Sequence, residues 1–334
     1  MMRTRPFVVL LAISTFLILF TARQHLHELG EVICTYSSFH KLVQQHPDLL
    51  YRYPESVAQT ERTPKILHNI ALGDADLTKY DTAIKSCRQL HPDWKHMLWR
   101  DDNAASFLSE HYPDILPHYT GYHQNIQRAN IIRYALLYKL GGVYLDLDVT
   151  CHVALDSTPL VRLPLVTPGA YPAGVNNAFI AAHPDHPFLA QLLNSLPSHD
   201  LYWGLPMRIP YVENMMSTGC MFFSNEWLVY VRELLAGRQE QKVFILANEQ
   251  GQTEPHMLRG KVTTPIFSHG GASSWHSWDA AMLVMIGKHY ILFLVLLLFA
   301  LTLAIGWPLY LCTASRRRPW RRRKCGVFSL MMSG

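Results

Sequence analysis

An uncharged apolar run near the C-terminus is the feature that most restricts how this chain can fold. The run covers residues 290–312 and reads YILFLVLLLFALTLAIGWPLYLC. An α-helix rises about 1.5 Å per residue, so the run is long enough to cross the roughly 30 Å hydrocarbon core of a bilayer. Tyr290, Trp307 and Tyr310 lie near its ends, where aromatic side chains favour the membrane interface. We therefore predict a transmembrane helix over residues 290–312.

A second apolar segment lies at the N-terminus. Residues 6–22 are uncharged and follow Arg3 and Arg5. They predict an N-terminal transmembrane helix, a signal anchor over residues 1–22. A cleaved signal peptide would have a similar composition. No small-residue cleavage pattern follows the run, so we favour the uncleaved anchor.

A basic tail follows the C-terminal apolar run. Seven cations lie between Arg316 and Lys324, and removing their charges from the formal net charge of +5 leaves the rest at −2. Because Lys and Arg beside a span mark the cytosolic side, residues 313–334 and the N-terminus are both expected in the cytosol. Residues 23–288 would then lie in the secretory lumen. A near-neutral main body argues against a nucleic acid partner.

Four cysteines fall in the predicted luminal part of the chain. They are Cys34, Cys87, Cys151 and Cys220. In an oxidising lumen they are free to pair, and the sequence leaves the connectivity open.

Between the two apolar runs, the pattern predicts an α/β domain over residues 61–282. Residues 23–60 are polar without a steady period and are interpreted as a stem or an initial helical region. Strands are expected over residues 65–70, 94–99 and 143–145, and helices over residues 81–90, 101–108 and 126–140. Strands that alternate with helices are typical of an α/β fold.

The strongest candidate for a functional site is Asp146-Leu147-Asp148. A buried helix is expected to end at Gly141-Gly142, because glycine tolerates the left-handed backbone that ends helices, and a short apolar strand then leads to Asp146. The strand period of two places both carboxylates on one side of the chain. Two such oxygens can hold a divalent cation that also binds diphosphate oxygens. The other Asp-x-Asp, residues 74–76, lacks this context and is interpreted as a solvated loop.

Two further groups of polar residues accompany this motif. Asn130 and Arg133 share one face of the predicted helix. They either pair with each other, cap a loop, or bind sugar hydroxyls beside Asp146. Residues 269–279 read HGGASSWHSWD. Glycines allow close approach of a ligand, hydroxyl and indole donors suit a phosphate, and a histidine can ligate a metal. The alternative is a loop with stray histidines, since the chain contains 18 of them.

The stretch QRANIIRYALLYKLGGVYLDLD, residues 127–148, resembles the sugar-binding region of glycosyltransferase family 32. The spacing from Arg133 to the Asp-x-Asp, with Gly-Gly-x-Tyr between them, carries the resemblance. Related segments are at residues 64–68, 174–177, 186–188, 217–219 and 274–279. With its C-terminal span, the chain most resembles the fungal inositol phosphorylceramide mannosyltransferases.

The resemblance implies the GT-A nucleotide-sugar transferase fold, a Rossmann-like mixed sheet flanked by helices. It implies a retaining enzyme of the Golgi or ER membrane that moves mannose from GDP-mannose to inositol phosphorylceramide, with Mn²⁺ or Mg²⁺ as cofactor. A regulatory subunit would fit the same resemblance. The alternatives are a mannosyl- or galactosyltransferase acting on glycoprotein glycans or another glycolipid, and a non-catalytic membrane subunit that retains the fold.

The resemblance also implies roles for individual residues. Asp148 would bind the metal directly, Asp146 would contact the ribose and the metal, and Arg133 would hold the donor sugar. The other implied residues are the metal ligands His269 and His276, and the donor-binding residues His68, Asn130, Asn177, Ser274 and Trp275.

Three positions depart from the family pattern. Asn130 stands where the family usually has Asp, which keeps hydrogen bonding but loses the charge. Ala178 stands where close relatives often have Asp, and Cys220 replaces a common Pro. These differences bear on which sugar the donor carries.

Overall fold

The computed structural model describes residues 4–58, 61–203, 208–253, 261–271, 278–289, 291–296, 298–300 and 302–304. The chain forms two compact units, residues 1–280 and 281–334. The candidate site residues that the structure describes all lie in the first unit.

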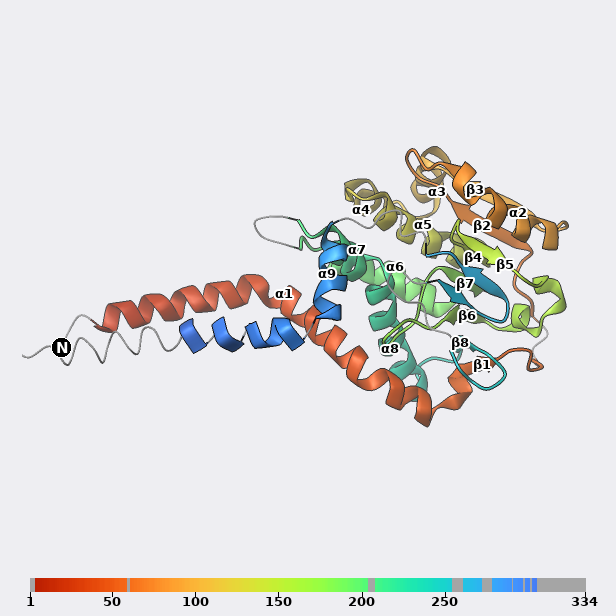
Figure 1. Cartoon of the computed structure of the whole chain (residues 1–334). Helices are drawn as coiled ribbons and strands as arrows, with labels where there is room; N and C mark the ends of the chain where they lie inside the picture. Colours follow the sequence, from red (N-terminus) through yellow and green to blue (C-terminus); the bar gives the residue numbers. More distant parts are fainter. Residues whose placement is uncertain are drawn as a thin grey trace, which may run out of the picture. The chain divides into compact units, whose positions relative to one another are not determined.

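A seven-stranded mixed sheet forms the centre of the first unit (Figure 1). Its strands lie in the order β1-β8-β6-β7-β4-β2-β3. Their bounds are β1 Leu50–Arg52, β2 Ile66–Ile70, β3 Lys95–Trp99, β4 Gly142–Leu145, β6 Leu165–Pro168, β7 Phe179–Ala182 and β8 Val243–Ala247. Among these strands β7 alone runs antiparallel to its neighbours. The carboxyl ends of β2, β3 and β4 therefore share one edge of the sheet, and the predicted α/β class is confirmed.

A small antiparallel sheet carries part of the candidate site. It contains β5 (Val149–Cys151), β10 (Phe267–His269) and β9 (Val262–Thr263), in that order. Its register places His269 opposite Val149. A residue distant in sequence is thus brought beside the end of the Asp-x-Asp motif.

Helices of the first unit pack on both faces of the main sheet. The helices of the described residues are α1 Thr4–Gln45, α2 Asp81–Leu90, α3 Asp101–His111, α4 Leu116–Gly121, α5 Asn125–Leu140, α6 Pro187–His199, α7 Pro210–Ser217, α8 Cys220–Leu235 and α9 Trp278–Lys288, with 3-10 turns η1 Pro47–Leu49, η2 Leu77–Tyr80, η3 Leu155–Ser157 and η4 Pro159–Arg162. On β4, Tyr144 packs in one apolar cluster with α5, α6 and α8, while Val143 and Leu145 pack in another with α2 and β5. The strand period of two thus gives the sheet a core on each face.

The helix-to-strand junction before the Asp-x-Asp motif forms as the sequence predicts. Helix α5 ends at Leu140, and Gly141 and Gly142 have φ angles of 62° and 99°. A Cβ atom on Gly142 would lie 2.7 Å from the Ile66 carbonyl oxygen. Both the positive φ and the close approach to β2 therefore require glycine.

One disulfide answers part of the question of cysteine pairing that the sequence left open. Cys87 of α2 is bonded to Cys151 of β5, whereas Cys34 and Cys220 are free cysteines. The disulfide therefore links β5, the strand that follows Asp148, covalently to α2.

Residues 23–60, interpreted from the sequence as a stem or an initial helical region, begin as a helix. Helix α1 continues from residue 4 to residue 45, and Phe39 packs its ring 5.3 Å from that of Trp227 on α8. Strand β1 then pairs with β8 at the edge of the main sheet. The sequence did not indicate this packing, because the buried side chains of the region are too few and irregularly spaced to show a period, although they complete the domain.

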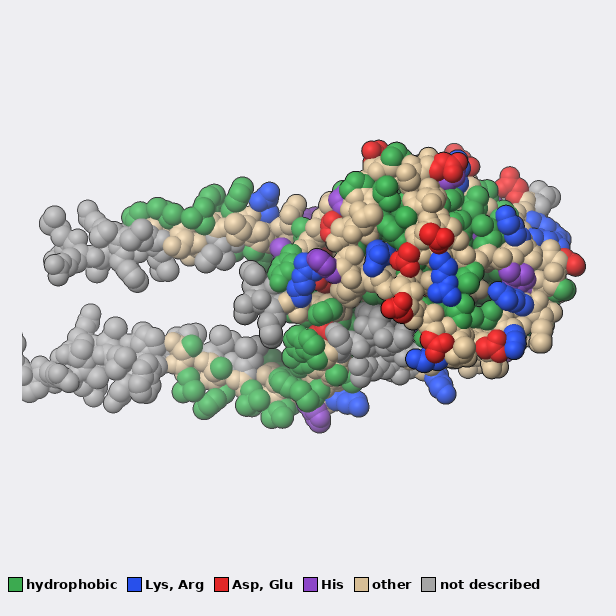
Figure 2. Space-filling model, turned by 90° about the horizontal axis from the view of Figure 1, so that it is seen from above, with side chains coloured by type: hydrophobic (Ala, Val, Ile, Leu, Met, Phe, Trp, Pro, Cys, Tyr) green, Lys and Arg blue, Asp and Glu red, His purple; other side chains and the backbone are tan. Residues whose placement is uncertain are grey.

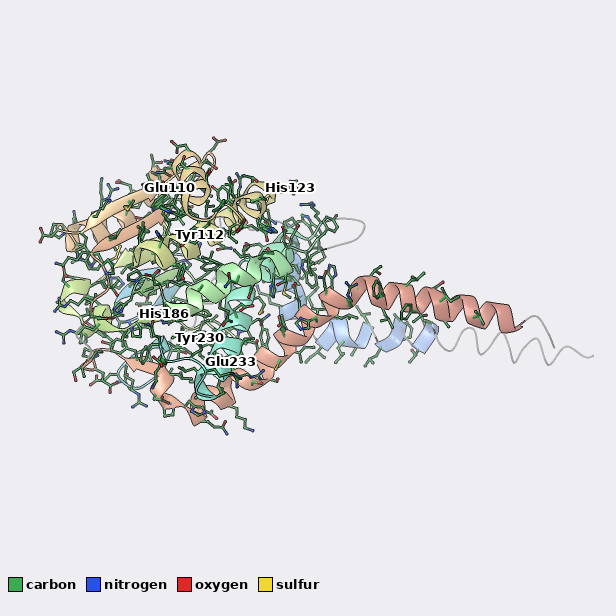
Figure 3. The ribbon with its side chains drawn as sticks, turned by 180° about the vertical axis from the view of Figure 1, so that it is seen from behind. Glu110, Tyr112, His123, His186, Tyr230 and Glu233 are labelled. Carbon is green, nitrogen blue, oxygen red and sulfur yellow. A yellow bond between two sulfur atoms is a disulfide. The ribbon has the colours of Figure 1, made fainter. Side chains whose placement is uncertain are left out.

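Segment 186–188, where the family resemblance places a related motif, has a structural role. The His186 ring caps α6 by accepting a hydrogen bond from the Phe188 N–H (3.2 Å), and it lies 6.0 Å from the Tyr230 ring of α8 (Figure 3). Burial lowers the pKa of His186 to about 4. The ring is therefore neutral at physiological pH and joins α6 to α8.

The predicted transmembrane helices are not shown by the structure. Within the described ranges no single helix is both long and apolar enough to cross a membrane, while Trp278–Ile286 and Ile291–Ala304, bent by 85°, together meet that test by length and composition. The predicted span over 290–312 lies partly outside the described residues, and the basic tail 313–334 lies wholly outside them. Figure 2 shows side chains of both charges mixed over the face of the first unit that it presents.

Buried ionisable side chains gather where α1 meets α6 and α8. The His199 Nε2 atom lies 3.6 Å from a Glu31 carboxylate oxygen. Glu28 is buried, and neither of its carboxylate oxygens has a hydrogen-bond partner. Burial raises the pKa of Glu28 to about 7. Burial alone would lower the pKa of His199, but Glu31 and the Ser195 carbonyl outweigh it and raise this pKa to about 9.

We predict that Glu28 and His199 make the folded domain less stable as the pH rises from about 5 to about 9. The native state holds more protons than the unfolded state at both groups, so their contribution to the free energy of unfolding falls with pH. Glu28 contributes between its ordinary value of 4.5 and about 7, and His199 between 6.5 and about 9. His68 and His186, whose pKa values burial lowers to about 4, act in the opposite direction below about pH 6.5. Melting temperatures in detergent measure the profile. Glu28→Gln should make stability rise more steeply with pH in its lower part, and His199→Gln should flatten its upper part.

Glu249→Gln, at an exposed position, is the control for this pH series. It should leave the profile unchanged. A profile that Glu28→Gln and His199→Gln both leave unaltered would show that other groups govern it.

Candidate active site

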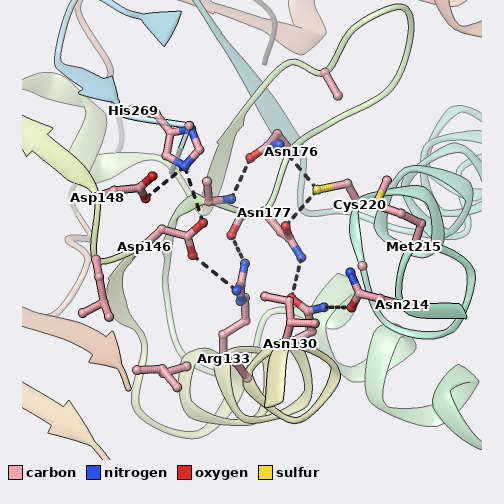
Figure 4. Close-up of a pocket in the computed structure, with 18 of the residues that line it drawn as sticks. Asn130, Arg133, Asp146, Asp148, Asn176, Asn177, Asn214, Met215, Cys220 and His269 are labelled. Carbon is pink, nitrogen blue, oxygen red and sulfur yellow. Dashed lines mark hydrogen bonds and ion pairs between the residues drawn. The ribbon is translucent and has the colours of Figure 1, made fainter. Parts of the chain in front are cut away.

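The end of β4 opens onto a cavity of about 760 Å³ (Figure 4). Asp146 and Asp148 follow β4, Asn130 and Arg133 project from α5, and His269 ends β10. All five line the cavity. The structure therefore brings these predicted site residues together from three separate parts of the sequence.

Three side chains form a candidate metal centre. One ligand atom from each of Asp146, Asp148 and His269 lies within 4.8 Å of the other two. The His269 Nε2 atom is 3.2 Å from an Asp148 oxygen and 3.7 Å from an Asp146 oxygen. Two carboxylates and an imidazole suit a divalent cation such as Mn²⁺. The donor set therefore fits the divalent cation that the sequence predicts at this motif.

A buried ion pair orients the first carboxylate. Arg133 is 2% exposed, and its Nη2 atom lies 3.3 Å from the Asp146 Oδ1 atom. Its Nη1 atom donates to the Asn177 carbonyl oxygen (2.5 Å), and the Tyr144 hydroxyl donates to Asp146 Oδ1 (2.6 Å). Burial alone would raise the pKa of Asp146, but Arg133 and His269 outweigh it and lower this pKa. Asp146 therefore stays ionised and faces the cavity.

The pKa of His269 has the opposite shift. Burial alone would lower it, but the two carboxylates raise the pKa of His269 to about 9. The histidine thus balances charge in the cluster by holding a proton. A cation would take over that role.

Asn130 belongs to a network of neutral groups and does not pair with Arg133. Its amide Nδ2 donates to Asn214 Oδ1 (3.0 Å) and Thr218 Oγ1 (3.1 Å), and its Oδ1 accepts from Asn177 Nδ2 (3.3 Å). The Cys220 thiol donates to Asn177 Oδ1 (3.0 Å). Each of the two amide groups therefore serves as both donor and acceptor within the wall of the cavity.

The network explains two departures from the family pattern. A carboxylate at position 130 could not donate to Asn214 and Thr218, and a proline at position 220 could not donate to Asn177. Asn214, in particular, was not predicted from the sequence. Its only signal was its nearness to the 217–219 segment of the family resemblance.

The structure does not place His68, predicted to bind the donor, in the lining of the cavity. Its ring is fully buried; Nε2 bonds to the Gly141 carbonyl oxygen (2.9 Å), and Trp99 Nε1 donates to Nδ1 (3.2 Å). Burial lowers the pKa of His68 to about 4. The residue lies in the middle of β2, whereas Ile70 and Ala71, at the strand's carboxyl end, line the cavity. His68 therefore supports the Gly-Gly junction.

The remaining predicted residues divide into two groups. Asn177 lines the cavity, but its amide is held by Asn130, Tyr134 and Cys220. Ser274, Trp275 and His276 lie outside the described residues. Just beyond them, Asp279 is buried and accepts a hydrogen bond from the Tyr211 N–H (2.5 Å), which ties the end of this segment to α7.

The second Asp-x-Asp is exposed, as expected. The Asp76 carboxylate caps η2 by accepting from the Thr78 N–H (3.0 Å). The loop nevertheless contributes Asp74 and Asp76 to the cavity lining, which its sequence alone did not indicate.

Comparison with known proteins agrees with this geometry. The family described as "Glycosyltransferase sugar-binding region containing DXD motif" matches residues 78–161. The chain is 30% identical to inositol phosphoceramide mannosyltransferase 1 of Schizosaccharomyces pombe, over 80% of this chain and 78% of that protein. The chain therefore belongs to this family of DXD-containing glycosyltransferases.

Two further relatives carry similar names. Inositol phosphoceramide mannosyltransferase 3 of Schizosaccharomyces pombe is 32% identical over 74% of this chain, and mannosyl phosphorylinositol ceramide synthase SUR1 of Saccharomyces cerevisiae is 33% identical over 71%. The aligned part spans 65% and 58% of these two proteins. Among solved structures, PaToxG glycosyltransferase is 15% identical with a TM-score of 0.37, covering 62% of this chain and 82% of that chain, a similarity too low to support an argument.

We predict that Asp148→Asn weakens Mn²⁺ binding by at least about tenfold, because loss of a group that merely orients a ligand already costs about 10–100-fold. Titration of the purified protein, followed by the electron paramagnetic resonance of free Mn²⁺, measures the dissociation constant. Asp93→Asn, at an exposed position outside the cavity, is the matched control. Equal affinities for the two variants would exclude Asp148 as a ligand.

We predict that Asn130→Asp lowers the free energy of unfolding. The substitution removes two donated hydrogen bonds from a buried network, a loss of about 1–3 kcal/mol. Chemical denaturation measures it, with the conservative Asn194→Asp, on α6, as the control. An Asn130→Asp variant as stable as the wild type would show that the network rearranges around a carboxylate.

Proposed function

We propose that this chain is a membrane-bound retaining glycosyltransferase of the GT-A fold that transfers mannose from GDP-mannose to inositol phosphorylceramide. The observation that carries the proposal is the cluster of Asp146, Asp148 and His269, held beside buried Arg133 on one cavity. Family membership supports glycosyl transfer. The names of the most similar relatives support this donor sugar and this acceptor.

The proposed cofactor is Mn²⁺ or Mg²⁺, held by Asp146, Asp148 and His269. When bound, the cation supplies a Lewis acid for the diphosphate leaving group. Arg133 keeps Asp146 ionised and fixes its orientation. The amides of Asn130 and Asn177 line the cavity and are available to sugar hydroxyls if they exchange a partner in their network.

We propose that the acceptor attacks the anomeric carbon on the same face from which the leaving group departs. This same-face attack retains the configuration of the sugar. Retaining hydrolases instead place a nucleophilic carboxylate about 5–5.5 Å from an acid. In the described lining of the cavity, the carboxylates outside the metal cluster are Asp74 and Asp76, both on an exposed loop. Neither is placed on the rigid wall that holds the cluster, so a covalent intermediate is not supported.

We place the catalytic domain in the lumen of the Golgi or ER, with both termini in the cytosol. The Cys87–Cys151 disulfide supports this placement, because disulfides persist in oxidising compartments. A membrane anchor suits a lipid acceptor, since both are then confined to one surface. The regulatory subunit stays a prediction.

The proposal predicts mannosyl transfer to lipid in membranes that contain the chain. Labelled GDP-mannose, Mn²⁺ and inositol phosphorylceramide should yield a mannosylated lipid, detected by chromatography and mass spectrometry. Asp148→Ala should lower the rate by more than about 100-fold, because the charge on the leaving group loses its stabilisation. Asp93→Asn should transfer at the wild-type rate.

Binding of GDP separates the ways in which this experiment can fail. GDP that stabilises the protein against heat only when Mn²⁺ is present, without lipid transfer, would point to another acceptor. Absence of both GDP binding and transfer would favour the non-catalytic subunit. Transfer that Asp148→Ala leaves intact would exclude the proposed metal centre.

A further inference from the structure

One side of the cavity is apolar, and binding of a polar nucleotide sugar does not account for it. Asp146, Asp148 and His269 lie on one side, and Figure 4 shows Met215 on the opposite side. Tyr211 precedes Met215 by one turn of α7, and Met221 opens α8; both line the cavity. A nucleotide sugar is polar along most of its length. A wall of aromatic and Met side chains therefore fits a second, apolar ligand.

Helix α1 contributes to this apolar wall through Tyr36. The His40 ring, one turn further along α1, bonds to the Pro172 carbonyl oxygen (2.7 Å), and Pro172 also lines the cavity. Tyr36 of α1 and Tyr211 of α7 line the same cavity. The apolar wall thus includes side chains of both helices.

An exposed apolar stripe leads along α1 to Tyr36. It consists of Leu26, Leu29, Ile33 and Tyr36, which are 51%, 45%, 69% and 37% exposed. Their spacing of three, four and three residues places them on one face of the helix. We call these four residues the α1 stripe. Its last member belongs to the cavity and its first lies near the predicted membrane anchor.

The other face of α1 is fixed to the domain, so the stripe points away from the core. Thr35 is buried and donates to Asn225 Oδ1 of α8 (2.8 Å), and Phe39 packs against Trp227. Nearer the N-terminus, Phe16, Leu17 and Phe20 are 66%, 54% and 53% exposed. Apolar side chains exposed in such numbers indicate contact with an apolar phase. The stripe therefore connects that phase to the cavity.

We infer that the α1 stripe and Met215 form the binding site for the apolar chains of a membrane lipid acceptor, whose headgroup reaches the metal cluster. The inference rests on the proposed function and adds to it the route by which the acceptor is bound. The polar side of the cavity holds the donor and the headgroup. The apolar chains lie along the α1 stripe, so the enzyme selects its acceptor by the lipid part as well as by the headgroup.

The test compares two acceptors on the full chain in detergent. One is inositol phosphorylceramide with long acyl chains, and the other is its short-chain, water-soluble analogue. The double variant Leu29→Gln/Ile33→Gln should lower kcat/KM for the long-chain acceptor by about tenfold or more, since one well-buried apolar contact is worth at least that factor. The KM for GDP-mannose and the rate with the short-chain acceptor should stay unchanged.

Val229→Gln is the matched control for the double variant. Val229 is an apolar residue of α8 with 41% exposure that does not line the cavity. It should leave both acceptors unaffected. Equal losses for both acceptors in the double variant, or no loss for either, would overturn the inference.

A labelling experiment tests the site even if the proposed transfer fails. Inositol phosphorylceramide with a photoreactive diazirine in its acyl chain should label the α1 stripe. Cleavage after Arg23 and Lys41 releases the whole stripe in one tryptic peptide, residues 24–41. Label on this peptide, reduced in the double variant and by excess unlabelled lipid, would support the site; label only elsewhere would overturn it. Labelling without transfer would leave the lipid site standing and refute the proposed reaction.

Discussion

The ion pair between Arg133 and Asp146 is the interaction on which the rest of the site depends. A guanidinium buried to 2% exposure needs a charged partner and further acceptors, and here they are Asp146 and the Asn177 carbonyl oxygen. These contacts join α5, the end of β4 and the segment before β7. The same contacts hold Asp146 ionised and fix one of the three groups that suit a cation.

The backbone around this ion pair determines where the other groups lie. Gly141 and Gly142 allow α5 to reverse into β4 against β2, with His68 bonded to the Gly141 carbonyl. Strand β5 then pairs with β10 and sets His269 beside Asp148. The metal cluster is thus assembled from one local motif and one long-range strand pair. On its far side the cavity is bounded by α7, α8 and α1, which supply apolar side chains.

Much of the fold could be predicted from local patterns. The helix over residues 81–90 and the helix, glycine pair and strand before Asp146 were placed correctly, because their periodicity and stop signals lie within a few residues of each other. The sequence left a stem and an initial helical region open for residues 23–60, since β1 is recognisable only by its pairing with β8. His68 was predicted to bind the donor because the strand that contains it was located correctly. Knowing the strand, however, does not show which of its residues lies at the edge of the sheet.

Short-range spacing was enough to locate the Asp-x-Asp motif, to align it with Arg133 on the preceding helix and to indicate the α/β class, because each of these features is encoded by residues close together in the chain. Only packing of the whole domain set the disulfide and the amide partners of Asn130, and it brought His269, which the family resemblance implied as a ligand, to the two carboxylates. Cys87 and Cys151 are 64 residues apart, and Asn130 and Asn214 are 84 apart. Such contacts form only when the whole core packs, and no local pattern records which cysteines or which amide side chains that packing will bring together.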